Sequence, residues 1–216
     1  MVLQDRAKAT REAIIAGAAK VFEEHGYGTA SITLVAHAAQ VTKGALYFHF
    51  KSKDELARAV VEEQHAIALR AGERVLADNT PALTTIIRLC GAFGSLLAQD
   101  QVVRAGIRLT LEASAFGQNV QGPYEDWIDI MSRLAEQGVH ENQIDPSVDP
   151  VVLARYVVAS FTGVQLVSNV LTGRKDVIER IQQMWEILLP GIIHEDSGLN
   201  PKCLAALVGQ TACADR

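Results

Sequence analysis

The sequence is poor in cysteine, which limits the ways in which its fold can be cross-linked. Its 216 residues contain three cysteines, Cys90, Cys203 and Cys213, at wide and irregular spacing. An odd number of cysteines at such spacing forms neither a disulfide framework nor a Cys-x-x-Cys metal pair. We therefore expect a protein of the reducing cytoplasm.

The sequence also has little that is typical of exported and membrane proteins. The N-terminus begins with charged residues rather than with an apolar core and a cleavage site, so no secretory signal is visible. Residues 156–173 carry no charge, but serine, threonine, glutamine and asparagine are interspersed among the apolar side chains. This stretch is too polar for a membrane span, and we expect no membrane partner.

Common catalytic and cofactor motifs are absent as well. We find no Gly-x-Ser-x-Gly elbow, no phosphate loop, no dinucleotide fingerprint and no His-Glu-x-x-His pair. His49 has no second histidine or cysteine at ligand spacing, and the polar run 194–196 is typical of a solvated loop. We expect no enzymatic activity, no cofactor and no metal.

Charge is distributed unevenly along the chain, whose formal net charge is −5. Residues 1–53 hold seven basic and four acidic side chains, a net of +3, whereas the remainder has a net of −8. A positive N-terminal segment on an acidic body is the distribution expected when only one end of a protein meets phosphate.

Hydrophobic periodicity predicts helices along the whole chain, and we find no credible strand. Residues 4–25 repeat apolar side chains on one helical face, and Gly26 follows as a left-handed cap. Ser52 and Glu55 form a capping box that starts a long helix. Beyond residue 77, helices are expected at 81–99, 101–115, 123–138, 149–172, 176–191 and 201–209.

The predicted helix at 149–172 is apolar on every face, and between Pro150 and Gly173 its only charge is Arg155. A soluble helix of this kind must be buried on both sides. One side can face its own core and the other a partner subunit, with helix 176–191 completing a four-helix dimer interface. The alternative is an ordinary central helix of a monomer.

Two short helices, one starting at Ser31 or Thr33 and the next after a cap at Thr42, have the dimensions of a DNA-reading helix-turn-helix. The second begins with Lys43 and Gly44. Since glycine has no side chain, this turn can lie flush against a groove wall, and Lys43 can reach a base edge. The alternative for Lys43 is a solvated helix residue.

Other side chains of this segment complete the predicted interface. Tyr47 lies one turn beyond Lys43 and can give its hydroxyl to a phosphate. His49, Lys51 and Lys53 extend the rim as phosphate contacts. Thr33 and Thr42 can offer hydroxyls and helix N-terminal amides. The following side chains are expected to face inward and lock the helix in place: Ala45, Leu46, Phe48 and Phe50.

The run TLVAHAAQVTKGALYFHFKSKDELA at 33–57, with FEEHGYGTASI before it, closely resembles the N-terminal signature of TetR-family regulators. In that signature a glycine, a tyrosine and a Tyr-x-His-Phe ending mark the recognition helix. VTKGALYFHF followed by Lys-x-Lys is most similar to the γ-butyrolactone receptors of actinomycetes. The stretch GPYEDWIDIM at 122–131 resembles them too, and Trp127 matches a tryptophan that lines their ligand cavity.

This resemblance implies an all-α fold of two domains. Residues 1–52 would form an N-terminal three-helix helix-turn-helix domain that binds DNA. Residues 53–216 would form a larger C-terminal helical domain for ligand binding and dimerisation.

The resemblance makes Trp127 a wall of the ligand cavity, although a tryptophan taken alone would more often pack in a core. Ser160, Thr162 and Gln165 lie in apolar surroundings, where an unpaired polar group costs about 1 to 3 kcal/mol. A bound lactone or hydroxyl would pair with them, as would backbone carbonyls one turn back. Gln64, on the helix that links both domains, is well placed to sense a ligand. The predicted apolar walls are Leu89, Phe93, Leu109 and Phe161.

The expected function is a ligand-responsive transcriptional repressor. A homodimer would bind an inverted-repeat operator in double-stranded DNA, and a small signalling molecule of the γ-butyrolactone type would release it. Two alternatives within the family are a regulator of another small hydrophobic ligand, as in efflux or drug sensing, and an orphan regulator that binds no lactone. In a different class, the chain would be a helical dimeric interaction protein without DNA binding.

Overall fold

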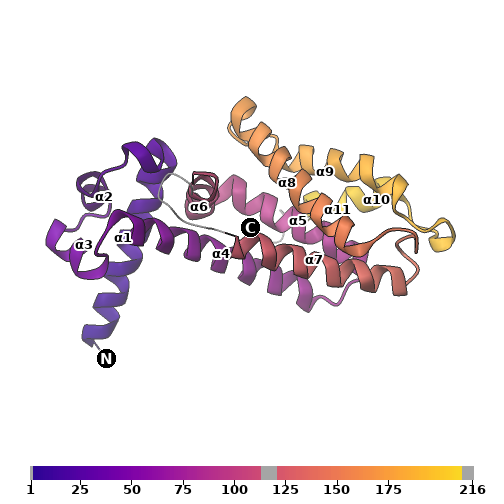
Figure 1. Cartoon of the computed structure of the whole chain (residues 1–216), viewed down its shortest axis with the longest axis horizontal. Coiled ribbons are helices and arrows are strands. Elements are labelled where there is room, and N and C mark those ends of the chain that lie inside the picture. Colours follow the sequence, from indigo (N-terminus) through magenta and orange to yellow (C-terminus); the bar gives the residue numbers. More distant parts are fainter. Residues whose placement is uncertain (1, 113–120, 211–216) are drawn as a thin grey trace. The chain divides into compact units, whose positions relative to one another are not determined.

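The computed structural model describes residues 2–112 and 121–210, with side chains from residue 6 onward, and confirms the predicted all-α fold (Figure 1). Contacts divide the chain into two compact units. Unit 1 comprises Met1–Ala68 and Asp100–Val120, and unit 2 comprises Leu69–Gln99 and Gln121–Arg216. Unit 1 therefore holds the whole predicted helix-turn-helix segment together with a later segment of the chain.

The first helix of unit 1, α1 (Val2–Thr29), is longer than expected. At Gly26 the backbone takes φ +73°, so the helix breaks where the left-handed cap was predicted, but a further turn follows to its end. A Cβ at this position would lie 2.5 Å from Arg108 Nη2. Glycine is favoured here by the positive φ, whereas the Arg108 side chain is flexible and could move away from a Cβ.

The two short helices begin at their predicted caps. Ser31 Oγ accepts a backbone N–H bond of 3.2 Å at the start of α2 (Ile32–Ala38). Thr42 Oγ1 accepts one of 3.1 Å at the start of α3 (Lys43–His49). These bonds satisfy amides that have no partner within the first turn of a helix, and they fix where each helix starts.

The capping box before α4 (Lys53–Ala77) is formed with one change of partner. Ser52 Oγ accepts the N–H of Glu55 at 3.1 Å, as predicted. The Glu55 carboxylate reaches back to the N–H of Lys51, at 2.6 Å, rather than to that of Ser52. The reciprocal pair therefore also restrains Lys51, two residues after the end of α3.

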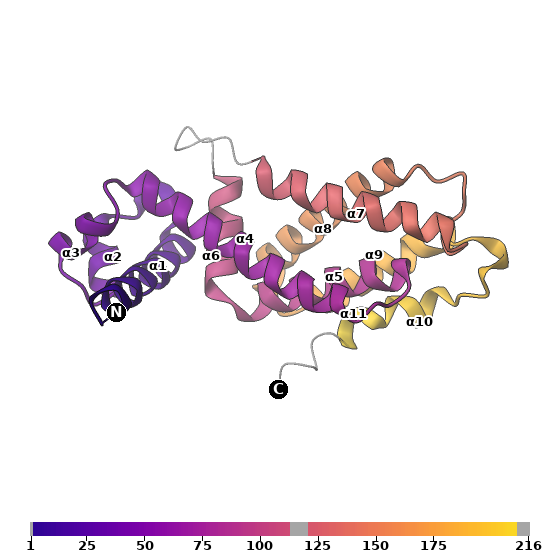
Figure 2. The ribbon, with the colours of Figure 1, turned by 90° about the horizontal axis from the view of Figure 1, so that it is seen from below.

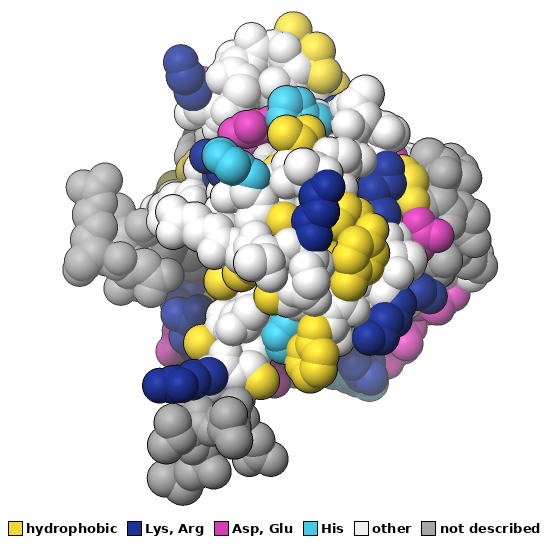
Figure 3. All heavy atoms as spheres, turned by 90° about the vertical axis from the view of Figure 1, so that its left-hand side faces the viewer, with side chains coloured by type: hydrophobic (Ala, Val, Ile, Leu, Met, Phe, Trp, Pro, Cys, Tyr) yellow, Lys and Arg dark blue, Asp and Glu magenta, His cyan; other side chains and the backbone are white. Residues whose placement is uncertain are grey.

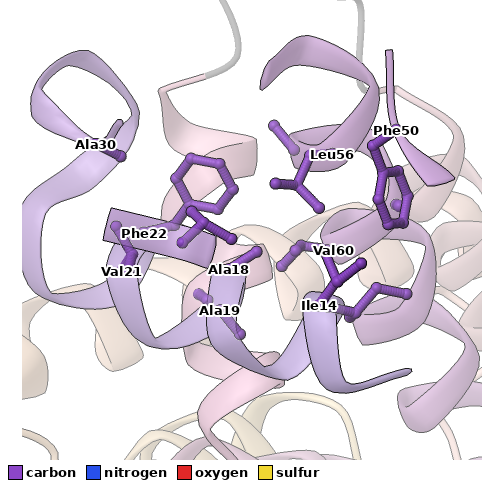
Figure 4. Close-up of a cluster of buried hydrophobic side chains, with 14 of the residues drawn as sticks. Ile14, Ala18, Ala19, Val21, Phe22, Ala30, Phe50, Leu56 and Val60 are labelled. Atoms are coloured by element: carbon purple, nitrogen blue, oxygen red, sulfur yellow. The ribbon is translucent and has the colours of Figure 1, made fainter. Parts of the chain in front are cut away.

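The core of unit 1 joins α1, α2, α3 and the first part of α4 (Figure 4). Its fully buried side chains include Phe22, Leu46, Phe50 and Leu56. Helix α6 (Gln101–Leu111) packs along α1 in the same unit. Because several helices share one core, the orientation of the short helix α3 is set by its contacts with its neighbours.

Unit 2 is built around α5 (Ala82–Gln99), which contacts α7, α9 and α11 (Figure 2). Its isolated bridge between Ile144 and Ile193 is the only β pairing among the residues described. The remaining helices are α7 (Gly122–His140), α8 (Pro150–Thr172), α9 (Val177–Leu188), α10 (Pro201–Ala205) and α11 (Leu207–Gln210). Each corresponds to a predicted helix, although the last prediction is divided in two. Positions 113–115 of the predicted helix 101–115, and Cys213, lie outside the described residues.

Helix α8 buries one of its apolar faces and exposes the other. Val157 and Phe161 are buried in unit 2, as are neighbouring residues one turn away. The opposite face exposes Val152, Tyr156, Leu166, Val167, Val170 and Leu171. By length and composition alone, α5 and α8 could each cross a membrane, a test that core helices of soluble proteins also pass.

Candidate functional site

The outward face of α3 carries the predicted DNA-contacting side chains. Lys43 and Gly44 are exposed, and Tyr47, one turn after Lys43, is 48% exposed. The opposite face is anchored by Leu46, which is fully buried. On this side of unit 1, Lys, Arg and His side chains surround exposed hydrophobic ones (Figure 3). The surface combines positive charge, hydroxyl groups and apolar contacts, which is the chemistry needed at a major groove.

The prediction that Phe48 faces inward is wrong, because its side chain is 73% exposed. Leu46 and Phe50 are buried as predicted. An α-helix turns about 100° per residue, so a side chain two positions after a buried one points away from the core. Phe50 lies four positions after Leu46, on the same side of the helix, and its burial agrees with this geometry.

The predicted phosphate rim is only partly exposed. Lys51 is exposed, and its ammonium donates to the carbonyls of Tyr47 and Phe48 at 3.1 and 3.3 Å, which caps the C-terminal end of α3. His49 is half-buried, and its ring meets the Phe48 ring edge-on at 5.2 Å between centroids. Thr33 is exposed, and the hydroxyl of Thr42 accepts the capping bond of α3. An ammonium and two hydroxyl groups thus remain at the edge of the exposed surface.

Lys53 has a different setting, which sequence reasoning missed. Its ammonium donates to the carbonyls of Tyr27 and Ala30 at 2.8 and 3.1 Å and lies 4.2 Å above the Tyr27 ring. The Tyr27 hydroxyl donates to Asp54. Burial, and to a smaller extent this hydrogen bond, raise the pKa of Tyr27 to about 12. The positive charge of Lys53 therefore serves the end of α1, and no local pattern around residue 53 could have indicated its distant partners.

In unit 2 the structure brings four predicted ligand residues together. The Phe93 ring stacks on the Trp127 ring at 5.8 Å and on the Phe161 ring at 5.4 Å, with interplanar angles of 20° and 13°. Leu89 lies beside the same rings. Gly72 contacts both residues, since a Cβ at this position would lie 3.5 Å from Leu89 Cδ2 and 3.5 Å from Trp127 Cη2. Three helices, α5, α7 and α8, thus contribute to one aromatic stack. Gly72 was not predicted, since nothing in its sequence neighbourhood signals the contact.

The polar candidates on α8 differ in their pairing. Gln165 is 2% exposed, and its side-chain Oε1 has no hydrogen-bond partner among the residues described. Thr162 Oγ1 donates to the Val158 carbonyl at 2.8 Å, which is the backbone alternative considered above, and Ser160 is half-buried. The phenol of Tyr124, which the sequence reasoning did not single out, bonds with Thr162. Burial raises the Tyr124 pKa and this bond opposes the shift.

Two further ligand candidates, Gln64 and Leu109, lie in unit 1. Gln64 is 2% exposed and packs on α6, where a Cβ at Gly106 would lie 2.4 Å from Gln64 Cβ. Leu109 is fully buried in the core of unit 1. The aromatic stack of unit 2 contains neither of them.

The described part of the chain, 2–112 and 121–210, contains no group of His, Cys, Asp and Glu side chains that could hold a metal ion. Cys90 is buried, and burial raises the pKa of its thiol to about 12, which keeps it protonated. Cys203 is exposed.

Two family models match the chain. The model described as bacterial regulatory proteins, tetR family, matches residues 14–60. The model described as tetracyclin repressor-like, C-terminal domain, matches residues 80–194. The first match covers the helix-turn-helix and the start of α4, and the second covers most of unit 2.

Individual relatives agree with these matches. The A-factor receptor protein of Streptomyces griseus is 38% identical over 194 residues, which are 90% of this chain and 67% of the relative. A gamma-butyrolactone receptor described as ArpA-like has 30% identity and a TM-score of 0.80, over 95% of this chain and 98% of that one. The TetR family protein CprB of Streptomyces coelicolor, solved with its biological operator sequence, has 31% identity and a TM-score of 0.79, with the same coverage.

Proposed function

The chain belongs to the TetR family of bacterial regulatory proteins, and from this premise we propose that it is a transcriptional repressor that a small signalling molecule releases from its operator. Membership confirms the family that was predicted from residues 33–57. It also confirms the prediction that the chain is a regulator and not an enzyme. TetR-family proteins bind operator DNA. The proposal concerns the operator symmetry, the dimer, the ligand and the residues that contact each of them.

The outward face of α3 is the observation that carries the proposal. Lys43 is exposed at the first turn, next to a glycine at position 44 where nothing but the Thr42 hydroxyl lies within 4 Å of an added Cβ. We assign base reading to Lys43, and phosphate contacts to Tyr47, Lys51 and the threonine hydroxyls. His49 and Lys53, which are half-buried, would contribute at the margin of the same surface.

A homodimer is supported by the exposed apolar face of α8. Val170 and Leu171 are 73% and 64% exposed, and Ile187 on α9 is 81% exposed. Pairing these helices with their copies in a second subunit would form a four-helix interface around a two-fold axis. Such a dimer presents two α3 helices to successive major grooves about 34 Å apart, which requires an inverted-repeat operator.

The ligand site that we propose is the region of unit 2 around Phe93, Trp127 and Phe161. Their stacked rings offer a flat apolar wall, and Gln165 offers a buried Oε1 acceptor that has no hydrogen-bond partner within residues 2–112 and 121–210. A small, largely apolar molecule with a hydroxyl group would satisfy both. The relatives named as receptors for A-factor and gamma-butyrolactone support a γ-butyrolactone-type signal. Gln64 and Leu109 would act through α4 and α6 of unit 1.

Ligand binding would release DNA by favouring a dimer whose recognition helices are wrongly spaced. A ligand with equal affinity for both shapes would change nothing, so it must bind the DNA-incompetent shape more tightly. The protein would work in the cytoplasm, where its DNA lies. No membrane is involved in this mechanism.

The proposal is tested by selecting duplexes from a random pool and measuring their mobility shift with the protein. We expect the selected site to be an inverted repeat that binds one dimer or more, and synthetic γ-butyrolactones to abolish the shift. Selection of no duplex at low salt would contradict DNA binding and favour a helical interaction protein. Release by other hydrophobic compounds but not by lactones would contradict the ligand assignment alone.

A further inference from the structure

The exposed ring of Phe48 is not explained by the folding of unit 1. Its side chain is 73% exposed, whereas Leu46 and Phe50 on either side are 0% and 1% exposed and already fill the core beside α3. An exposed phenylalanine contributes nothing to hydrophobic stabilisation. A basic side chain lies nearby, since the Lys51 ammonium donates to the backbone carbonyl of Phe48.

The position of Phe48 on α3 directs the ring toward the same surface as Lys43. Phe48 lies one turn after Gly44, so these two residues share a helical face. On the helical wheel, Lys43, Tyr47, Gly44 and Phe48 follow one another within an arc of about 140°, and Gly44 and Phe48 lie about 160° from the buried Leu46. Gly44, inside this arc, allows the backbone to approach the groove floor. Lys43 and Phe48 then flank the point of closest approach.

The ring is also restrained. The half-buried His49 meets it edge-on at 5.2 Å with an interplanar angle of 90°, so Phe48 has a fixed neighbour on one side. A partly fixed ring loses less conformational entropy when it is covered. On the floor of a major groove, the group that an apolar ring can cover is the 5-methyl group of thymine, the one apolar feature of the base-pair edges.

We propose that Phe48 is a specificity-determining residue that recognises a thymine methyl group in each half of the operator. The inference rests on the proposed DNA binding and adds an apolar contact to the polar base reading assigned to Lys43. Covering one methyl group should improve affinity about fourfold, the value expected for removing one carbon from water.

The experiment uses the full-length protein and the duplex that it selects from a random pool. Thymines are replaced one position at a time by deoxyuridine, which removes only the methyl group, and the Kd is measured for the natural protein and for Phe48→Ala. We expect one symmetric pair of thymines at which deoxyuridine weakens the natural protein about fourfold per half-site and leaves Phe48→Ala unaffected. A Phe48→Leu variant should retain part of the methyl effect.

Two results would overturn the proposal. The first is that no deoxyuridine substitution affects the natural protein, or that each affects Phe48→Ala equally. The second is that Phe48→Ala weakens the selected and a scrambled duplex by the same factor, since the ring would then contact only the sugar-phosphate backbone. Both require a duplex that binds, so they are distinguishable from a failure of DNA binding itself. Circular dichroism and the unfolding midpoint check that the exposed substitution leaves the fold unchanged.

Discussion

Gln64 on α4 packs against Gly106 on α6 with no space for a methyl group between them. A Cβ at position 106 would lie 2.4 Å from Gln64 Cβ and 2.6 Å from its Cγ. Because Cβ is the fixed base of a side chain, the overlap cannot be relieved by a change of rotamer alone. The distance between the two helices in unit 1 is therefore set by this pair.

We expect Gly106→Ala to lower the free energy of unfolding by about 1 to 3 kcal/mol, the usual cost of overpacking. The loss should occur although alanine favours a helix more than glycine does. Gly28→Ala is the matched control, because a Cβ there has no neighbour within 4 Å. Urea unfolding of both variants decides the matter: equal stabilities would mean that α4 and α6 tolerate wider spacing.

Lys43 and Lys51 should differ in how their loss affects DNA binding. Lys43→Ala should reduce the difference in binding free energy between the operator and a scrambled duplex by about 1 to 3 kcal/mol, because a base contact is lost. Lys51→Ala should weaken both duplexes alike and reduce the slope of log K against log salt by about one. Fluorescence anisotropy at several salt concentrations measures both. An unchanged affinity ratio for Lys43→Ala would contradict its assignment to base reading.

Local signals were sufficient to predict the helix starts, and contacts between distant segments were not. Ser31 and Thr42 cap their helices through bonds three residues away, which the sequence displays directly. Lys53 bonds to carbonyls of the α1 end more than twenty residues earlier, and only the folded core brings them together.

Phe48 shows a different kind of failure. Its inward orientation was predicted from its hydrophobicity beside Leu46 and Phe50, yet helical geometry forbids a helix from burying alternate residues. In unit 2, Phe93, Trp127 and Phe161 were selected separately, two as apolar walls and one by resemblance. Their stacking into one surface emerged only from the packing of three helices.

Trp127 should matter for the ligand response and not for the DNA contact. We expect Trp127→Ala to bind the selected duplex with unchanged affinity but to require about tenfold more synthetic γ-butyrolactone for release, since one end of the aromatic stack is lost. Asp129→Ala, an exposed position on the same helix, is the control. Mobility-shift titrations give both quantities, and a normal ligand response of Trp127→Ala would move the site elsewhere.

The carboxylate of Asp176 gives unit 2 a pH dependence of known sign. It accepts bonds from Ser168 Oγ at 2.6 Å, Thr172 Oγ1 at 2.7 Å and Arg180 Nε at 2.7 Å, and these lower its pKa from 3.8 to about 2. A depressed pKa in the folded state stabilises the fold above the unfolded value, and this stabilisation is lost as the pH falls.

We therefore expect Asp176→Asn to be less stable than the natural protein at neutral pH. The difference in unfolding free energy should shrink between about pH 4 and pH 2 as the natural carboxylate is protonated in the unfolded and then the folded state. Denaturant unfolding across this range provides the measurement. A difference that stays constant with pH would show that the asparagine acts through packing instead.

The apolar face of α8 should respond strongly to a single charge. In a dimer related by a two-fold axis, Val170→Asp would place two carboxylates in one interface, where desolvation and mutual repulsion both oppose association. We expect sedimentation velocity to give a dimer for the natural protein and a monomer for Val170→Asp, with loss of operator binding. Leu76→Asp, at an exposed position on α4, should remain dimeric. The dimer would be contradicted if the natural protein were monomeric and sedimented with lipid vesicles. Lipid, rather than a second subunit, would then cover the apolar face of α8.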